Sequence, residues 1–194
     1  SRKGTKRASK IMHFGSGAFF RSFVASLIDK VNQYDIEKWG IVAVSLNSES
    51  TFDKLADQDF VFNALSISSH KNQIQQVSSI SNIFVAKKDR QSVLAALSDE
   101  KIKIVSLTIT EKGYNYNPNK KELDVGNQNI IDDLRNPENP KTAVGFLVAG
   151  LRARYLNGKT PFTVLSCDNL PNNGAVVQKV VLDFAQKIDP NFAT

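Results

Sequence analysis

Four short, mainly apolar runs constrain the fold of this 194-residue chain more than any other feature. Such runs are typical of strands that are buried on both faces, as in a parallel sheet. They are followed or separated by segments whose apolar residues recur at helical spacing. The apolar runs cover residues 11–14, 40–46, 102–109 and 162–166, and the helical segments cover residues 19–31, 90–97, 142–156 and 174–188. The alternation predicts an α/β fold, a doubly wound, mostly parallel sheet with helices on both faces.

The remaining segments are predicted less regularly. Alternating apolar residues over 60–68 and 73–77 indicate a hairpin around 70–72. Residues 49–59 form a short helix or loop, residues 83–89 a connector, and residues 114–129 a long polar surface loop. The helix over 142–156 is predicted to be amphipathic, with Arg152 and Arg154 off its apolar face. We divide the chain into a frayed basic segment 1–10, a domain 11–188, and residues 189–194 as the start of a linker.

The turn after the first strand, residues 15–21, is the first candidate site. Gly15 can adopt a backbone conformation that other residues resist, and Gly17 lets the main chain approach a pyrophosphate closely. The helix that follows points its amino-terminal amides at that charge. Phe20 stands where the G-x-G-x-x-G fingerprint of dinucleotide sites has its third glycine. A tight turn without a ligand is therefore equally compatible, and Arg21 either pairs with phosphate or is a solvated helix residue.

The end of the second strand supplies the second candidate. Glu49 lies just past that strand, where dinucleotide sites place an acidic residue on the adenosine ribose. A carboxylate there accepts hydrogen bonds from ribose hydroxyls and repels a 2′-phosphate, which favours NAD over NADP. A surface glutamate that opens a helix fits the sequence equally well.

Two further candidates follow later strands, because ligands of open α/β sheets bind at the carboxyl ends of strands. Thr108 and Glu111 follow the third apolar run, and Asn169, which offers a donor and an acceptor, follows the fourth. Cys167 has no neighbouring histidine in the sequence, so we interpret it as a small buried residue. His13 lies within the first strand and is interpreted as a core histidine.

Composition narrows the classes of function. The net charge is +6, but basic and acidic residues are interleaved, so we interpret the charge as a solvated surface and expect no nucleic acid partner. No apolar run approaches the roughly 18 residues of a membrane span, so no membrane partner is expected. One cysteine and two histidines do not suit a zinc site. A single cysteine fits a reducing compartment such as the cytoplasm.

The chain resembles the mannitol dehydrogenase family of polyol-specific long-chain dehydrogenases, which includes the fructuronate and tagaturonate reductases. The matching segments are His13-Phe14-Gly15-Ser16-Gly17-Ala18-Phe19-Phe20-Arg21, residues 39–46, residues 104–114, residues 143–147 and Pro161-Phe162-Thr163-Val164-Leu165-Ser166-Cys167-Asp168-Asn169-Leu170-Pro171. The last segment is the most specific because so long an ordered string is rare by chance. Family members usually have histidine at the positions of Phe20 and Phe23, and often aspartate at that of Ser50.

The resemblance implies a Rossmann-like coenzyme domain of an enzyme that transfers hydride between NAD(H) and a sugar alcohol or keto-sugar. Family members use no zinc, and their general base is a lysine in a second, largely helical domain, which would follow residue 194. The chain alone is therefore expected to be inactive. Asn169 matches a residue at the reaction centre, and the expected cofactor contacts are Gly15, Ser16, Gly17, Ala18, Phe19, Arg21, Glu49, Thr108, Glu111 and Asn169. A non-catalytic nucleotide-binding or partner-binding module is the alternative.

Overall fold

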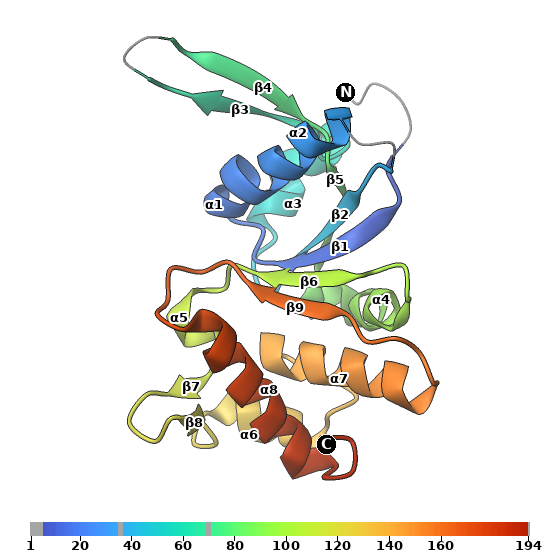
Figure 1. The fold of residues 1–194 in the computed structure, drawn as a ribbon, viewed down its shortest axis with the longest axis vertical. Helices are drawn as coiled ribbons and strands as arrows, with labels where there is room; N and C mark the ends of the chain where they lie inside the picture. The colour runs from blue at the N-terminus through green and yellow to red at the C-terminus, as the bar shows by residue number, and fades with distance from the viewer. Residues whose placement is uncertain (1–5, 35–36, 69–70, 194) are drawn as a thin grey trace.

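The fold is built on a five-stranded parallel sheet. The structure is a computed structural model that describes residues 6–34, 37–68 and 71–193. Across the sheet the strands follow the order β5 (Ile80–Val85), β2 (Gly40–Ser45), β1 (Ser9–Phe14), β6 (Ile104–Leu107) and β9 (Thr163–Ser166) (Figure 1). The chain runs outward from β1 to β5 and then returns to the other side of β1. The predicted doubly wound α/β fold is confirmed, and its switch point lies between β1 and β6.

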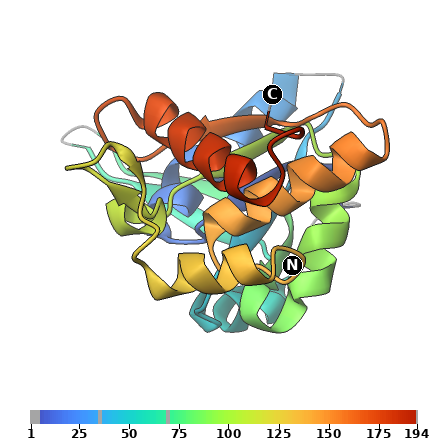
Figure 2. The ribbon, with the colours of Figure 1, turned by 90° about the horizontal axis from the view of Figure 1, so that it is seen from below.

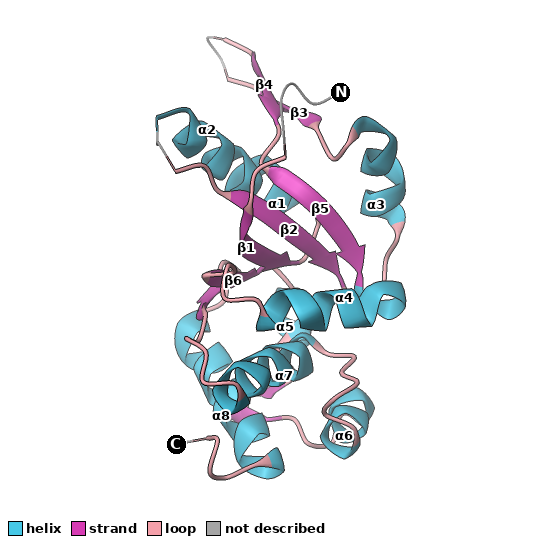
Figure 3. Cartoon of the chain, turned by 90° about the vertical axis from the view of Figure 1, so that its right-hand side faces the viewer, coloured by secondary structure: helices cyan, strands magenta, loops and turns pink. Residues whose placement is uncertain are grey.

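Helices cover both faces of this sheet, as predicted. The first face carries α1 (Ala18–Phe20), a π-helical turn η1 (Arg21–Ala25), α2 (Ser26–Tyr34), α3 (Ser50–Leu55) and the 3₁₀ turn η2 (Ala56–Gln58). The opposite face carries α4 (Ala86–Ser98), α7 (Ala143–Leu156) and α8 (Asn173–Ile188). Figure 3 shows β1, β2 and β5 between these groups of helices.

Side-chain direction along the strands explains the two cores. Ile11 of β1 and Ile41 of β2 pack against α1–α3, whereas Met12 and Val42, one residue further on, pack against α4 and α7. Successive side chains of a strand point to opposite faces, so a strand covered on both sides is apolar throughout. This is why the continuous apolar runs predicted the strands β1, β2, β6 and β9 correctly.

An outer layer lies beyond α7 and α8. It contains α6 (Gln128–Arg135) and a short ladder of β7 (Tyr116–Asn117) with β8 (Glu122–Leu123) (Figure 2). The short helix α5 (Thr110–Gly113) lies outside this layer, at the carboxyl end of β6. Ile130 of α6 and Leu123 of β8 pack against Phe184 of α8. The predicted surface loop 114–129 therefore contains regular structure, and Tyr114 at its start is fully buried.

The predicted hairpin is confirmed. β3 (Phe62–Ser66) pairs with β4 (Gln73–Val77) in antiparallel register, and the hairpin projects from the body of the domain (Figure 1). His70, around which the turn was predicted, lies outside the described residues.

The predicted connector 83–89 is wrong. Ile80–Val85 forms β5, the edge strand beside β2, and α4 starts directly after it at Ala86. The polar residues Ser79 and Ser81 flank Ile80, so this strand does not appear in the sequence as a continuous apolar run. The Ser79 hydroxyl donates to the Ala25 carbonyl at 2.7 Å and the Ser81 hydroxyl to the Ile41 carbonyl at 3.0 Å. These bonds make buried serines compatible with the core.

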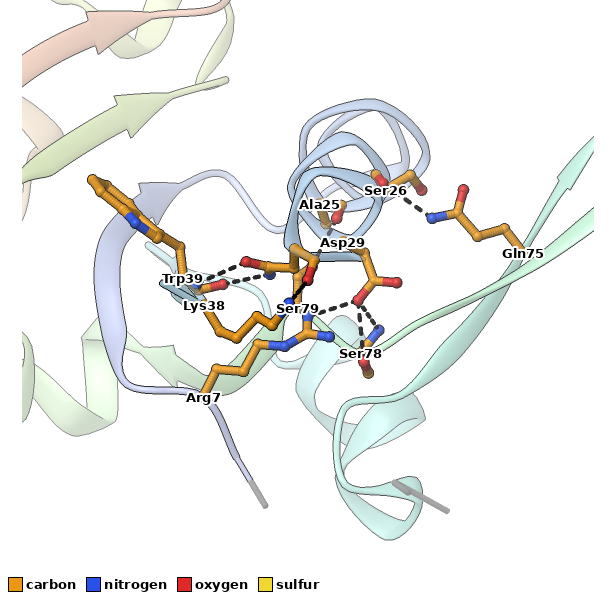
Figure 4. A network of polar contacts seen from close by, with 10 residues as sticks. Arg7, Ala25, Ser26, Asp29, Lys38, Trp39, Gln75, Ser78 and Ser79 are labelled. Carbon is orange, nitrogen blue, oxygen red and sulfur yellow. Dashed lines mark hydrogen bonds and ion pairs between the residues drawn. The ribbon is translucent and has the colours of Figure 1, made fainter. Parts of the chain in front are cut away.

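The predicted frayed segment 1–10 is too long at its carboxyl end, because β1 begins at Ser9. Arg7 donates to the buried Asp29 of α2 at 2.8 Å, and the Ser78 amide donates to the same oxygen at 3.0 Å. Figure 4 shows these bonds together with those of Ser79 and Gln75. The network joins the start of β1, helix α2 and the segment before β5. Residues 1–5 lie outside the described residues.

The amphipathic pattern predicted for 142–156 is also wrong in one respect. Arg154 is 1% exposed, and its guanidinium donates to four main-chain carbonyls, those of Leu97, Asp99, Ile102 and Thr160. The side chain was expected to point to solvent. Instead it donates to three carbonyls between the end of α4 and the start of β6 and to the Thr160 carbonyl before β9.

Candidate functional site

The glycine turn lies at the switch point of the sheet. Gly15 has a φ of +107°, and a Cβ built on it would lie 2.1 Å from the Thr108 carbonyl oxygen. Its amide donates to the Val44 carbonyl at 2.8 Å. The end of β1 therefore passes so close to the end of β6 that only glycine fits, both in space and in backbone conformation.

Gly17 differs from Gly15 in both respects. It is the N-cap residue of α1 with an ordinary extended backbone, φ −67° and ψ −179°. A Cβ built on it would meet no described atom within 4 Å. The main chain at Gly17 is consequently exposed, and a ligand can approach it without displacing protein atoms.

Arg21 and Thr51 hold the turn from the side. Arg21 Nη1 donates to the Ser16 carbonyl at 2.7 Å and to Thr51 Oγ1 at 3.4 Å. Thr51 Oγ1 donates to the same carbonyl at 3.3 Å. Ser16 itself is 6% exposed. Arg21 is therefore not a freely solvated helix residue, and its guanidinium stays beside the turn.

His13, in β1, supports the same turn through hydrogen bonds to two side chains of the neighbouring strand end. Its ring is fully buried, Nδ1 lies 2.7 Å from Ser106 Oγ, and Nε2 lies 2.8 Å from Thr108 Oγ1. Thr108 Oγ1 donates its single hydrogen to the Gly15 carbonyl at 3.1 Å, so it accepts from Nε2–H of His13. Nδ1 is then the acceptor for the Ser106 hydroxyl. Burial lowers the pKa of His13 to about 3, against a smaller opposing effect of the Gly15 carbonyl. The interpretation of His13 as a core histidine is confirmed.

Phe20, at the position of the missing third glycine, is fully buried. Its ring stacks on His13 with centroids 3.9 Å apart and an interplanar angle of 11°. The other aromatic residue that departs from the family pattern, Phe23, is 57% exposed and stacks on Phe19. The stack on His13 thus stabilises the neutral ring that supports the turn.

The carboxyl end of β2 forms a second part of the site. Glu49 is the N-cap residue of α3, and its carboxylate forms an ion pair with Lys88 of α4. Lys88 donates a hydrogen bond to the Glu49 carboxylate, and this bond is the main cause that raises the pKa of Lys88. A cleft of about 240 Å³ lies nearby, lined by Leu46, Asn47, Ala86, Lys87, Arg90, Pro140, Lys141 and Phe146.

The ends of β6 and β9 are joined by Asp168. Its Oδ2 accepts from the Ile109 amide at 2.9 Å and from the Tyr114 hydroxyl at 2.7 Å, and Oδ1 accepts from the Thr110 amide at 3.3 Å. Thr110 has a φ of +66°, which is unusual for a β-branched residue. Backbone strain of this kind is typical of functional sites. Burial raises the pKa of Tyr114, and the bond to Asp168 acts in the same direction.

The structure brings some predicted residues together and leaves others apart. Thr108 contacts Gly15 directly, whereas Glu111 and Asn169 are exposed at the ends of β6 and β9. Cys167 is half-buried and not fully buried as expected, and burial raises the pKa of its thiol. The roles of Asp168 and Lys88 were missed, since each residue contacts partners far away in the sequence and no local pattern marks it.

The described residues contain neither a metal cluster nor a membrane-spanning helix. No three histidine, cysteine or acidic residues among them are arranged to hold a metal ion. In the part of the chain that the structure describes, no helix is long and apolar enough to cross a membrane.

Comparison with known proteins identifies the relatives of the chain. A family profile described as the mannitol dehydrogenase Rossmann domain matches residues 9–194. An uncharacterized oxidoreductase YeiQ of Escherichia coli is 42% identical over 187 residues, which are 95% of this chain and 38% of that protein. Mannitol 2-dehydrogenase of Pyricularia oryzae is 39% identical over 188 residues, 94% of this chain and 38% of the relative.

Solved structures agree with these relatives. The ternary complex of Pseudomonas fluorescens mannitol 2-dehydrogenase with NAD and D-mannitol superposes with a TM-score of 0.90 at 35% identity, covering 97% of this chain and 39% of that one. A D-sorbitol dehydrogenase in substrate-free form gives a TM-score of 0.90 at 36% identity, covering 96% and 40%. The chain therefore spans about two fifths of the length of the relatives that it matches.

Proposed function

The chain belongs to the mannitol dehydrogenase family, as its Rossmann domain, and from this premise we propose that it binds NAD(H) for a polyol or keto-sugar oxidoreductase. One observation carries the proposal. At the switch point between β1 and β6, Gly15 closes the turn against Thr108 while Gly17 leaves the main chain open to a ligand. Dinucleotides bind at such a switch point, outside the carboxyl ends of the strands.

The residues of the turn fit a pyrophosphate. The exposed backbone at Gly17 and Ala18 precedes the continuous helical segment 18–34, whose amino-terminal end favours negative charge. Arg21 adds a guanidinium held beside the turn by the Ser16 carbonyl at 2.7 Å. Ser16 and Phe19 complete the set of turn residues that we assign to the cofactor.

The other strand ends would hold the two halves of the dinucleotide. Glu49, after β2, is assigned to the adenosine ribose. Thr108, Glu111 and Asn169, after β6 and β9, are assigned to the nicotinamide side, where Asn169 can both donate and accept. Bound NAD supplies hydride acceptance, and this chain's residues orient it and keep the turn rigid.

The reaction needs a proton acceptor that we assign to a further domain of a longer protein. The relatives are longer than this chain, which covers 38% of the first of them. We propose a sugar alcohol or a keto-sugar as the substrate, because the relatives include mannitol 2-dehydrogenases and a polyol:NADP oxidoreductase. A cytoplasmic location is proposed from the single cysteine.

Titration with NADH, followed by its fluorescence, tests the proposal. The wild-type chain is expected to bind NADH, and Gly17→Val is expected to weaken binding at least tenfold, because the new side chain occupies the space at the main chain. Gly126→Val, in a loop of the outer layer, serves as the matched control and is expected to bind as wild type. Failure of the wild-type chain to bind NADH would refute the proposal.

A second measurement addresses the module alternative. Mixed with NAD and mannitol, the 194-residue chain is expected to show no turnover, since the proton acceptor is assigned elsewhere. Robust turnover by this chain would contradict that assignment. Binding of NADH by a longer parent protein that also shows no turnover with any polyol would favour a non-catalytic nucleotide-binding module.

A further inference from the structure

The ribose end of the proposed site carries three basic residues. Lys87, Lys88 and Arg90 follow β5 directly, in the first turns of α4, and this segment lies beside the loop that follows β2. Glu49 reaches across to it from the N-cap of α3. The residue assigned to the ribose hydroxyls is therefore already bound to a protein cation.

The ion pair between Lys88 and Glu49 is open to exchange. The two side chains are 61% and 41% exposed, and exposed pairs of this kind are weak. A ligand group can replace either partner at little cost. The Lys88 ammonium group donates to the Glu49 carboxylate, and this hydrogen bond raises the pKa of Lys88. A phosphate that arrives beside Glu49 would find an ammonium group in position.

Arg90 and Lys87 add to this end in different ways. Arg90 is anchored by the Pro140 carbonyl at 2.9 Å and by Asn139 Oδ1 at 2.7 Å, so its guanidinium is held at the cleft wall. Lys87 is exposed and has no ion-pair partner among residues 6–34, 37–68 and 71–193. Lys141, the remaining cation of the cleft, is bound to Asp132 at 2.8 Å.

Acidic residues limit the charge but do not reverse it. The negative charges of Asp53 and Asp89 also raise the pKa of Lys88. The Asp89 carboxylate accepts a hydrogen bond from the Val85 amide at 2.9 Å. Three cations and three carboxylates thus share this end, whereas a site that selects against a 2′-phosphate presents an unpaired carboxylate to the ribose. The local charge neither repels a phosphate strongly nor deprives the ribose of an acceptor.

We propose that Lys88, with Lys87 and Arg90, forms a subsite for the 2′-phosphate of NADP(H), so that the chain binds NADP(H) as well as NAD(H). The inference rests on the proposed function, since it concerns the same nucleotide site. When NAD binds, the Glu49 carboxylate accepts hydrogen bonds from the ribose hydroxyls, and its ion pair with Lys88 is broken. With NADP, the phosphate takes the place of the Glu49 carboxylate at Lys88.

Parallel titrations with NADH and NADPH, followed by nucleotide fluorescence, test the subsite. In the wild-type chain the two Kd values are expected to lie within tenfold of each other. Lys88→Gln is expected to raise the ratio of the NADPH Kd to the NADH Kd at least fivefold, because it removes the phosphate's cation and frees Glu49. Glu49→Gln is expected to lower the same ratio.

The matched control is Lys179→Gln, which removes a lysine from an exposed carboxylate pair with Asp183 in α8. It is expected to leave the ratio unchanged. A wild-type ratio above ten, or a ratio that Lys88→Gln raises less than fivefold, overturns the subsite while NADH binding still supports the proposed function. If neither nucleotide binds to the wild-type chain, the proposed function itself fails.

Discussion

Replacing Gly15 with alanine gives the most direct test of the glycine turn. The new Cβ would lie 2.1 Å from the Thr108 carbonyl oxygen and 2.8 Å from its carbonyl carbon. Both are main-chain atoms of the strand end that supports the site, so they cannot rotate away as a side chain would. The φ of +107° would also become unfavourable.

The expected loss of stability is the sum of three effects. A positive φ costs a residue with a Cβ roughly 1–2 kcal/mol. Displacing the packed main chain to relieve the overlap costs about 1–3 kcal/mol. The lower entropy of the unfolded chain offsets about 0.4–1 kcal/mol of this cost. The middle values of these ranges sum to about 3 kcal/mol, and we expect Gly15→Ala to lower the free energy of unfolding by that amount.

Urea unfolding followed by circular dichroism measures the effect, and Gly17→Ala is the matched control. At Gly17 the backbone is extended and the Cβ meets no described atom within 4 Å. The control is expected to change the free energy of unfolding by less than about 1 kcal/mol. In thermal unfolding, Gly15→Ala should lower the Tm by roughly 5–15 °C, at about 2–4 °C per kcal/mol for a chain of this size.

Two results would refute this reasoning. A Gly15→Ala variant as stable as the wild type would show that β1 and β6 do not approach closely at the turn. A Gly17→Ala variant as unstable as Gly15→Ala would show that Gly17 is required for the fold, and its exposed main chain could no longer be assigned to a ligand.

Three other residues give testable predictions. Because the pKa of His13 is about 3 in the folded chain and 6.5 ordinarily, the unfolded state binds the proton more tightly and stability falls as the pH drops below 6.5. Between pH 7 and pH 5 the free energy of unfolding, measured with urea, should fall by about 2 kcal/mol. His13→Gln should not show this fall, and an equal pH dependence in both proteins would contradict a buried, neutral His13. Arg154→Met leaves buried carbonyls without a donor and should cost about 3 kcal/mol or more in unfolding free energy, whereas a cost below 1 kcal/mol would show that Arg154 is solvated. The buried Asp133 accepts from the Lys141 amide at 2.8 Å and from the Thr142 amide at 2.9 Å. Asp133→Ala should therefore lower the free energy of unfolding by about 2–4 kcal/mol, with Asp132→Ala as a near-neutral control. Equal losses in the two variants would refute the role of Asp133.

Polar residues in the core mark the limit of sequence reasoning in this chain. Asp29 and Arg154 are buried, whereas Phe23 and Leu27 on the first helical segment are at least half exposed. Apolar spacing alone predicted the helix but not which of its faces turns inward. The inward face of α2 accepts Asp29 because Arg7 and Ser78 satisfy its carboxylate. Both partners are distant in the sequence, so no local pattern shows them.

The candidate site divides in the same way. The glycine turn and the strand ends were predictable, because Gly15 and Gly17 follow an apolar run directly and parallel strands end at one edge of the sheet. The pairing of Glu49 with Lys88 and the bonds from Asp168 to Ile109 and Thr110 were not predictable. They depend on which strands become neighbours.

The sequence by itself determined the parallel sheet, the turn at the switch point and the family resemblance. A strand that is buried on both faces is apolar throughout, so it appears in the sequence as a continuous apolar run. A tight turn that needs a positive φ favours glycine, so the turn is also visible in the sequence. Only the tertiary structure decided that Gly15 is closed by Thr108, that Gly17 is open, and that Lys88 pairs with Glu49. These features arise from contacts between separate strand ends, and the order of strands in the sheet brings those ends together.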